Sequence, residues 1–200
     1  MVKVALLASG RGSNTEAIIK HFQNHTNVEI EVFSDVVDAP VLALASGLGI
    51  KAEYLPFDEN YDYFSQNSFD LYVLAGYMRI LPDEVLNLGT FVNIHPSLLP
   101  AFKGKNAIKQ AYDYGAKVTG VSVHYVTKDL DNGPIIAQVP VNIEQWMNLA
   151  ELEEEIHNTE HTLYPMVIES LLYDKIVDFA PGKPKCSTGG CGGCGGSCAH

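Results

Sequence analysis

Short apolar runs alternate with segments of helical periodicity over the first 95 residues, and this alternation limits the fold more than any other feature. The runs with the length of strands are 2–8, 28–33, 52–55, 71–75 and 90–94. The first run is almost continuously apolar, as expected of a strand that is buried on both faces. The segments that suit helices are 17–22, 40–48 and 82–88. This order predicts an α/β fold with a Rossmann-like, mostly parallel sheet flanked by helices.

The second half of the chain departs from this alternation. Residues 107–114 suit a helix, residues 118–126 alternate in polarity, and residues 135–141 form another apolar run. The sequence Asp-Leu-Asp-Asn-Gly-Pro at 129–134 joins the last two segments and is typical of a hairpin turn. A long helix is predicted over 149–172, where an acidic first turn suits the positive end of the helix dipole. We therefore expect antiparallel strands to extend the sheet in the C-terminal half.

Cysteine and charge divide the chain into two parts. All four cysteines lie within the last fifteen of the 200 residues, so no disulfide framework supports the preceding part. Residues 1–178 contain 24 acidic and 11 basic residues, a net charge of −13. We expect one domain at 1–178 and a flexible Gly/Cys-rich tail at 179–200.

The same composition excludes several classes of partner. A strongly acidic domain disfavours a broad nucleic-acid surface. No apolar run approaches the roughly 18 residues that cross a membrane, and the N-terminal run is too short for a signal peptide. We expect a cytoplasmic protein, monomeric or homodimeric, that acts on small molecules and binds neither nucleic acid nor membrane.

A glycine-rich loop, Ser-Gly-Arg-Gly-Ser-Asn at 9–14, ends the first strand and opens a helix. Its small residues allow backbone N–H groups and the Ser13 hydroxyl to close on a phosphate at a helix N-terminus. The same residues also suit a tight turn in which Ser13 or Asn14 caps the helix. The loop matches neither Gly-x-Gly-x-x-Gly nor a P-loop, which argues against a nucleotide triphosphate.

Asn93 and His95 lie near the C-terminal end of a predicted parallel strand, where open α/β sheets place their ligands. Because they are two residues apart, their side chains point to the same face of the strand. An amide donor beside an imidazole can stabilise a developing oxyanion. We therefore interpret this pair as a candidate catalytic site.

Asp131 allows two interpretations, and His124 has a default one. The Asp131 carboxylate can fix a histidine in its charged form, or it can be ordinary turn chemistry, and spacing does not separate the two. His124 alternates with apolar neighbours and is interpreted by default as a structural histidine. Ser97 lacks a Gly-x-Ser-x-Gly elbow, which argues against a hydrolase nucleophile.

Five segments together resemble the folate-dependent glycinamide ribonucleotide formyltransferases. They are Ala-Ser-Gly-Arg-Gly-Ser-Asn at 8–14, Leu-Ala-Gly-Tyr-Met-Arg-Ile-Leu at 74–81, Asn-Ile-His-Pro-Ser-Leu-Leu-Pro at 93–100, Gly-Val-Ser-Val-His at 120–124 running on to Asp-Asn-Gly-Pro at 131–134, and Glu-His at 160–161 with Leu-Tyr-Pro at 163–165. They occur in the family's order across roughly residues 1–178. The resemblance implies the formyltransferase fold.

The resemblance also implies a role for individual residues. Those implied to bind the ribonucleotide are Gly12, Ser13, Asn14, His157 and Glu160. Those implied to bind folate are Met78, Arg79, Ile80, Leu81, Asn93, Thr127, Lys128, Asp129, Leu130 and Asp131. The implied catalytic set is Asn93, His95 and Asp131.

The implied reaction moves a formyl group from 10-formyltetrahydrofolate, the cosubstrate, to the amine of 5-phosphoribosylglycinamide in de novo purine biosynthesis. Asn93 and protonated His95 would stabilise the tetrahedral oxyanion while Asp131 holds His95 charged. The chemistry needs neither a metal nor a covalent enzyme intermediate.

Other reactions use the same His-Pro-Ser loop. A formyltetrahydrofolate deformylase gives the formyl group to water and remains the alternative function, while a methionyl-tRNA formyltransferase would need a basic surface and a further domain. A binding module without catalysis is disfavoured by the intact catalytic set. The chain departs from the family at Asp35, where Asn is common, and in a shorter segment at 56–68 that leaves the affinity for the folate glutamate tail open.

Cys186, Cys191, Cys194 and Cys198 have spacings that suit zinc or an iron–sulfur cluster. A flexible, redox-reactive appendage is the alternative, and nothing in the family's chemistry requires the tail. No metal is expected in the domain itself.

Overall fold

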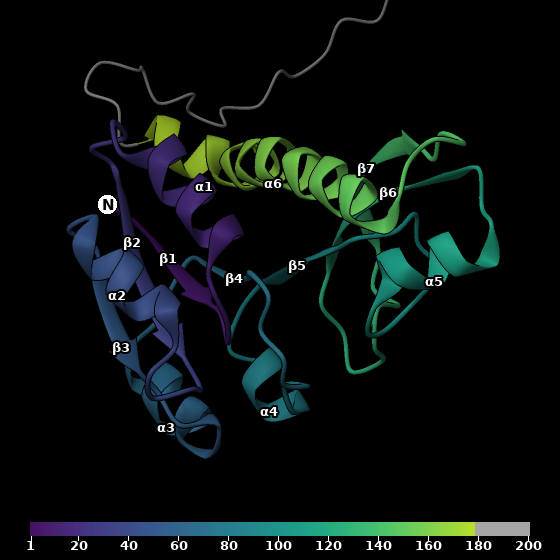
Figure 1. The fold of residues 1–200 in the computed structure, drawn as a ribbon. Helices are drawn as coiled ribbons and strands as arrows, with labels where there is room; N and C mark the ends of the chain where they lie inside the picture. Colours follow the sequence, from purple (N-terminus) through teal and green to yellow (C-terminus); the bar gives the residue numbers. More distant parts are fainter. Residues whose placement is uncertain (179–200) are drawn as a thin grey trace, which may run out of the picture.

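A single seven-stranded sheet forms the centre of the computed structural model, which describes residues 1–178 (Figure 1). The strands are β1 (Val2–Leu7), β2 (Val28–Ser34), β3 (Lys51–Tyr54), β4 (Leu71–Leu74), β5 (Phe91–His95), β6 (Val118–Tyr125) and β7 (Ile135–Asn142). Their order across the sheet is β3-β2-β1-β4-β5-β6-β7. The first five strands pair in parallel, whereas β6 and β7 are antiparallel additions. The predicted fold class is therefore confirmed.

Helices cover both faces of this sheet. They are α1 (Ser13–Phe22), α2 (Pro40–Gly47), α3 (Asn60–Gln66), α4 (Asp83–Leu86), α5 (Ala107–Tyr114) and α6 (Leu149–Asp178), with a 3₁₀ turn, η1 (Phe57–Glu59). Helices α1 and α6 run side by side over one face, and α3 and α4 lie on the other (Figure 1). In the residues that the structure describes, no helix is long and apolar enough to cross a membrane.

Strand β1 shows why both faces need a cover. Val4 and Leu6 join the apolar cluster under α1, α2 and α6, while Ala5 and Leu7 join the aromatic-rich cluster under α3 and α4. All four are at most 1% exposed. Because successive side chains of a strand point to opposite faces, a continuous apolar run is the pattern that a strand between two helical layers requires.

The sequence prediction missed the helical segment at 57–66. Residues 60–66 read Asn-Tyr-Asp-Tyr-Phe-Ser-Gln and contain no strong apolar period. Only Asn60 and Phe64 are buried there, and the Phe64 ring meets Phe33, Phe69 and Tyr72 edge-on at centroid distances of 5.2–6.0 Å. Tertiary packing of one ring thus stabilises a helix that local propensity does not predict.

The strand order places the loops that carry the candidate site next to one another. Strand order reverses between β1 and β4, which are neighbours in the sheet although 63 residues lie between them along the chain.

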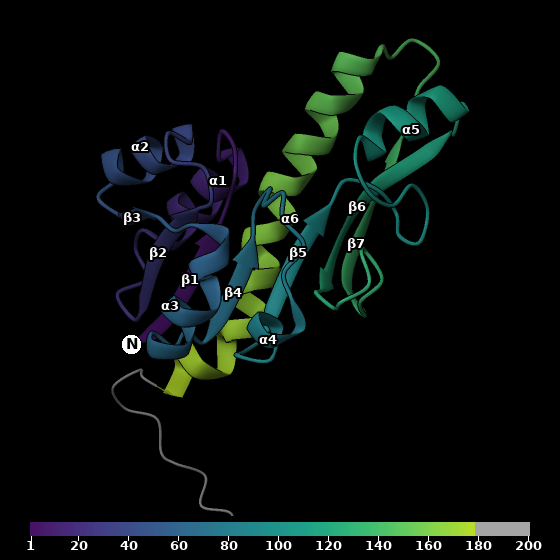
Figure 2. The same cartoon turned by 90° about the horizontal axis from the view of Figure 1, so that it is seen from below.

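 Residues 8–70 lie between these two strands along the chain. Ligands of open α/β sheets bind in the crevice beyond the carboxyl ends of the strands at such a reversal. The loops after β1, β4 and β5 therefore meet at one edge of the sheet (Figure 2).

Candidate active site

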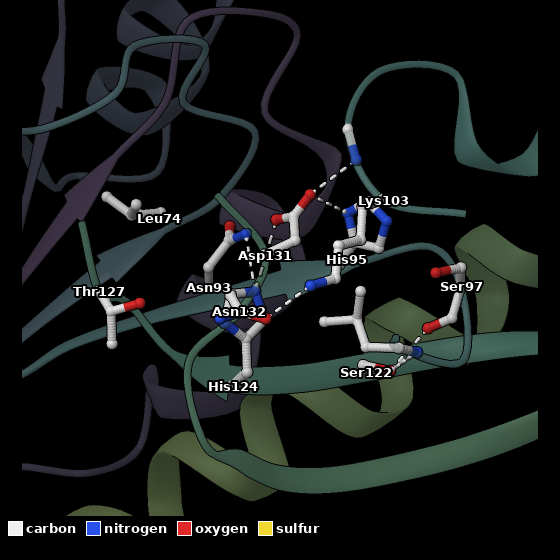
Figure 3. Close-up of polar contacts among 12 residues, drawn as sticks. Leu74, Asn93, His95, Ser97, Lys103, Ser122, His124, Thr127, Asp131 and Asn132 are labelled. Atoms are coloured by element: carbon white, nitrogen blue, oxygen red, sulfur yellow. Dashed lines mark hydrogen bonds and ion pairs between the residues drawn. The ribbon is translucent and has the colours of Figure 1, made fainter. Parts of the chain in front are cut away.

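The three predicted catalytic side chains meet at the carboxyl end of β5 (Figure 3). Asn93 and His95 belong to β5, and Asp131 comes from the turn between β6 and β7. Asp131 Oδ2 lies 3.5 Å from His95 Nδ1. The carboxylate and the imidazole are both nearly enclosed, with side chains 5% and 6% exposed. Segments 36 residues apart in the sequence thus form one polar cluster in an otherwise apolar part of the fold.

His95 has an oxygen acceptor at each ring nitrogen. Its Nε2 lies 2.9 Å from the carbonyl oxygen of Phe102, and its Nδ1 faces the Asp131 carboxylate. A neutral imidazole has only one N–H, so it can satisfy only one of two acceptors. Each ring nitrogen of His95 thus faces one oxygen of its surroundings. Phe102 presents its carbonyl from a left-handed backbone conformation, with a φ of 52°, which is costly for a phenylalanine.

His124 belongs to the same cluster, which the default interpretation as a structural histidine did not predict. Its Nδ1 lies 2.9 Å from the Tyr125 carbonyl oxygen, so that nitrogen carries the proton and Nε2 is the acceptor. Asn93 Nδ2 donates to Nε2 over 3.3 Å, and Asp131 Oδ1 lies 3.7 Å away. Burial lowers the pKa of His124 from 6.5, outweighing the opposite effects of the Tyr125 carbonyl and Asp131. His124 is thus a neutral ring that orients the Asn93 amide.

The turn that carries Asp131 is held by its own contacts. Gly104 N–H donates to Asp131 Oδ2 over 2.8 Å, and Lys103 Nζ donates to Asn132 Oδ1 over 2.6 Å. Asp131 has a φ of 48°, a left-handed conformation that aspartate adopts more readily than most residues. The loop after β5 and the β6–β7 turn are therefore joined at the carboxylate.

Ser122 and Gln138 hold the loop that follows His95, and no sequence signal identified either residue. Ser122 Oγ donates to the Ser97 carbonyl and accepts from Leu99 N–H, at 2.6 and 3.0 Å. Gln138 Nε2 donates to the Leu99 carbonyl over 3.0 Å and to Ser122 Oγ over 2.8 Å. Pairing of β6 with β5 and β7 brings these side chains under the loop, so sequence spacing alone does not reveal them.

A pocket opens beside the cluster and contains most of the residues predicted to bind folate. It is lined by Leu74, Tyr77, Arg79, Ile80, Leu81, Asn93, His124, Val126, Thr127, Asp129, Leu130 and Asp131. Met78 and Lys128, which were also predicted, are not in this lining. A more open hollow between β7 and α6, which includes Val139 and Met166 in its lining, contains none of the predicted site residues.

The glycine-rich loop opens α1 without a side-chain cap. Gly12 occupies the N-cap position with a φ of 83°, and a Cβ there would collide with the Val41 side chain. Neither Ser13 nor Asn14 caps the helix. Instead, Asn14 Nδ2 donates over 3.1 Å to Glu160 Oε2 on α6. Of the two interpretations of this loop, the one based on side-chain capping is wrong, and the backbone at the start of α1 stays free to receive an anion.

The ribonucleotide residues predicted on α6 lie along one side of that helix. Glu160 is 5% exposed, and His157 is exposed and stacks on His161 at a centroid distance of 6.5 Å. Asn14 Oδ1 is buried and has no hydrogen-bond partner within the described part of the chain. An unsatisfied oxygen beside an enclosed carboxyl is typical of a site that receives a ligand.

The buried carboxyl of Glu160 predicts a specific pH dependence of stability. Burial raises its pKa from 4.5 to about 7, and the Asn14 hydrogen bond opposes this rise. Between these pH values the unfolded chain ionises Glu160 while the folded chain retains the proton, so stability falls as pH rises towards about 7. Glutamine has no proton to lose, so its variant escapes this fall. We expect the free energy of unfolding of Glu160→Gln, minus that of wild type, to be on the order of 2 kcal/mol larger at pH 8 than at pH 5.

Urea unfolding of both proteins at several pH values measures this gain. Glu154 is exposed on the same helix, so Glu154→Gln is the matched control. A stability difference between Glu160→Gln and wild type that stays constant from pH 5 to pH 8 would contradict the assignment.

Asp35 joins the loops after β1 and β4. It is a position at which the sequence departs from the family that it resembles. Ser9 Oγ donates to Asp35 Oδ1 over 2.5 Å, and Arg79 Nε donates to Oδ2 over 2.9 Å. Met78 N–H in turn donates to Ser9 Oγ over 2.9 Å. The Asp35 side chain is only 3% exposed, and the Arg79 guanidinium lies over the Phe57 ring at 5.6 Å. The glycine-rich loop and the 76–81 loop are therefore connected through one carboxylate.

Comparison with known proteins identifies the family of the chain. The family model described as "Formyl transferase" matches residues 2–168. A phosphoribosylglycinamide formyltransferase of Bacillus subtilis is 40% identical over 186 residues, covering 86% of this chain and 95% of that protein. The enzyme of the same name from Escherichia coli is 36% identical and covers 84% of this chain and 85% of its own length.

A solved structure of similar sequence has the same fold. The crystal structure of phosphoribosylglycinamide formyltransferase from Bacillus halodurans superposes with a TM-score of 0.81 at 38% identity, covering 86% of this chain and 96% of that one. Sequence and fold thus agree, and the chain belongs to the formyl transferase family, among the phosphoribosylglycinamide formyltransferases.

Proposed function

We propose that this protein transfers the formyl group of 10-formyltetrahydrofolate to the amine of 5-phosphoribosylglycinamide, a step of de novo purine biosynthesis. The observation that carries the proposal is the position of Asn93 and His95, which lie together at the carboxyl end of β5 with Asp131 against the imidazole. The relatives named phosphoribosylglycinamide formyltransferase support transfer to the ribonucleotide rather than to water.

The phosphate of the ribonucleotide binds at the start of α1 in this proposal. Gly12, Ser13 and Asn14 supply backbone and side-chain donors there, and the positive end of the helix dipole favours an anion. His157 and Glu160 on α6 contact the ribose and glycinamide end. The hydrogen bond between Asn14 and Glu160 supports this assignment, because it joins the two groups of residues.

The pterin binds in the pocket between the 78–81 loop and the 127–131 turn, largely through backbone groups. The lining of the pocket supports this, because it includes Asn93 and Asp131 beside residues of both segments. Leu81 is buried, while Ile80 and Leu130 expose 63% and 56% of their surface and offer apolar area to a flat ring. The formyl carbon then comes close to His95.

The reaction follows from these positions. The amine of the ribonucleotide attacks the formyl carbon, a C–N bond forms, and the carbonyl oxygen becomes an oxyanion. Asn93 donates to that oxyanion, and one N–H of His95 leaves its present acceptor to do the same; one such donor is typically worth roughly 3–4 kcal/mol of barrier. The intermediate collapses by breaking its bond to the folate N10, which takes the proton that the amine loses. Asp131 keeps His95 charged and relays this proton through water.

Asp131→Asn tests the proposed mechanism. The amide keeps the shape of the side chain but loses the negative charge opposite His95, so kcat is expected to fall by about 10²-fold or more. Absorbance of the folate product, recorded with and without the ribonucleotide, measures the rate. Activity of Asp131→Asn within about threefold of wild type would contradict the assigned role.

Asp35→Asn tests whether the two substrate loops are coupled. Asparagine has one acceptor oxygen where Asp35 has two and carries no charge, so Ser9 or Arg79 loses its present acceptor. Because Arg79 is 57% exposed, we expect a loss of only about 1 kcal/mol, seen as a roughly fivefold higher KM for the folate with little change in kcat. Asp113→Asn removes only the exposed pair with Lys109 and is the matched control. An unchanged KM would argue against coupling through Asp35.

A further inference from the structure

A cluster of two histidines and one glutamate lies where α1 packs on α6, away from the residues assigned to catalysis. His21 is in the last turn of α1, His25 follows that helix, and Glu169 is on α6. One ligand atom from each lies within 4.8 Å of the other two. Among the side chains that the structure describes, those of residues 1–173, no other three histidine, cysteine or carboxylate groups come this close together.

The distances within this cluster suit a small divalent ion. Glu169 Oε2 lies 2.7 Å from His21 Nε2, and Glu169 Oε1 lies 3.9 Å from His25 Nε2. Two ligands at roughly 2.0–2.1 Å from a tetrahedral zinc ion are about 3.3 Å apart, which lies between these separations. The carboxylate would therefore move away from His21 and towards His25 when an ion binds.

The imidazole rings are already held in position. His21 and His25 stack at a centroid distance of 5.8 Å, and both meet the ring of Phe22 edge-on at 5.0 and 5.1 Å. Phe22 is 4% exposed, so its ring belongs to the core. The two histidine side chains are 29% and 28% exposed, which leaves an entry path for an ion. Ligand ordering therefore costs little when an ion binds.

We infer that His21, His25 and Glu169 form a binding site for a divalent transition-metal ion of the zinc type. Imidazole nitrogen and carboxylate oxygen are ligands that such ions accept, and three protein ligands leave a fourth position for water. The strongly acidic domain also favours a cation. The bound ion joins the end of α1 to α6, the two helices that also carry Asn14 and Glu160. The inference does not depend on the proposed reaction.

Zn²⁺ titration of the full chain tests this site. Because the spacing of the tail cysteines also suits zinc, the parent protein for the test carries Cys186→Ser, Cys191→Ser, Cys194→Ser and Cys198→Ser. Isothermal titration calorimetry is expected to detect one equivalent of Zn²⁺ per chain, and Zn²⁺ is expected to raise the thermal unfolding midpoint. Binding should vanish in His21→Asn/His25→Asn and weaken on the order of tenfold or more in Glu169→Gln.

His157→Asn provides the matched control, because His157 and His161 form the other i,i+4 histidine pair but belong to no such three-residue cluster. It should leave the equivalent of Zn²⁺ unchanged. Two results would overturn the inference and leave His21 and Glu169 as an ion pair only. One is absence of Zn²⁺ binding in the cysteine-free parent. The other is binding that persists in the double variant His21→Asn/His25→Asn, when circular dichroism shows that the parent and the double variant are both folded.

Discussion

Replacing His95 with alanine is expected to lower kcat for formyl transfer by on the order of 10³-fold. The substitution removes a cationic donor to the oxyanion, a loss typically of roughly 3–4 kcal/mol, and it leaves the Asp131 carboxylate without its imidazole partner. Because His95 lies at the reacting centre rather than in the ribonucleotide loop, the KM for the ribonucleotide should change much less. Steady-state kinetics with each substrate varied in turn measures both constants.

Folding has to be separated from catalysis in that experiment. His95 is buried, and its Nε2 also faces the Phe102 carbonyl, so the alanine variant is compared with His95→Gln, which retains a donor of similar reach. A folded His95→Ala protein that keeps more than about a tenth of the wild-type kcat would contradict the role assigned to the imidazole.

Gly133→Ala is expected to destabilise the protein by roughly 2–4 kcal/mol and to reduce activity at the same time. A Cβ at this position would collide with the backbone carbonyl of Tyr125, which cannot move without shifting β6. The turn displaced by this collision is the one that holds Asp131. Chemical denaturation and the formyl-transfer assay, applied to the same samples, measure the two effects.

Gly47→Ala is the matched control for that substitution. Gly47 ends α2, and a Cβ there would meet no atom within 4 Å. Alanine is a better helix former than glycine, so this variant should be as stable as wild type or more stable by up to about 1 kcal/mol. Equal stability of Gly133→Ala and Gly47→Ala would show that the turn tolerates displacement.

The strands could be predicted because their burial leaves a pattern in the sequence. Continuous apolar runs marked β1 and β4, and alternation followed by Asp-Asn-Gly-Pro marked the hairpin of β6 and β7. Asn93 and His95 were predicted to share a face because strand geometry fixes the direction of residues two apart. These inferences need only the local chain.

The parts that were missed depend on contacts between distant segments. His124 lies opposite Asn93 in the pairing of β5 with β6, and this register is not evident from either strand alone. The acceptor for Asn14 is Glu160, 146 positions away along the chain. The tail cysteines Cys186, Cys191, Cys194 and Cys198 lie outside the described residues, so their predicted role stays a prediction.

The fate of the formyl group tests the central claim most directly. The protein is incubated with 10-formyltetrahydrofolate and 5-phosphoribosylglycinamide, and mass spectrometry compares the formylated ribonucleotide with free formate. We predict that nearly all of the formyl group appears on the ribonucleotide and that little folate is turned over when the ribonucleotide is omitted. Release of formate at the same rate with and without the ribonucleotide would contradict the claim and identify a deformylase.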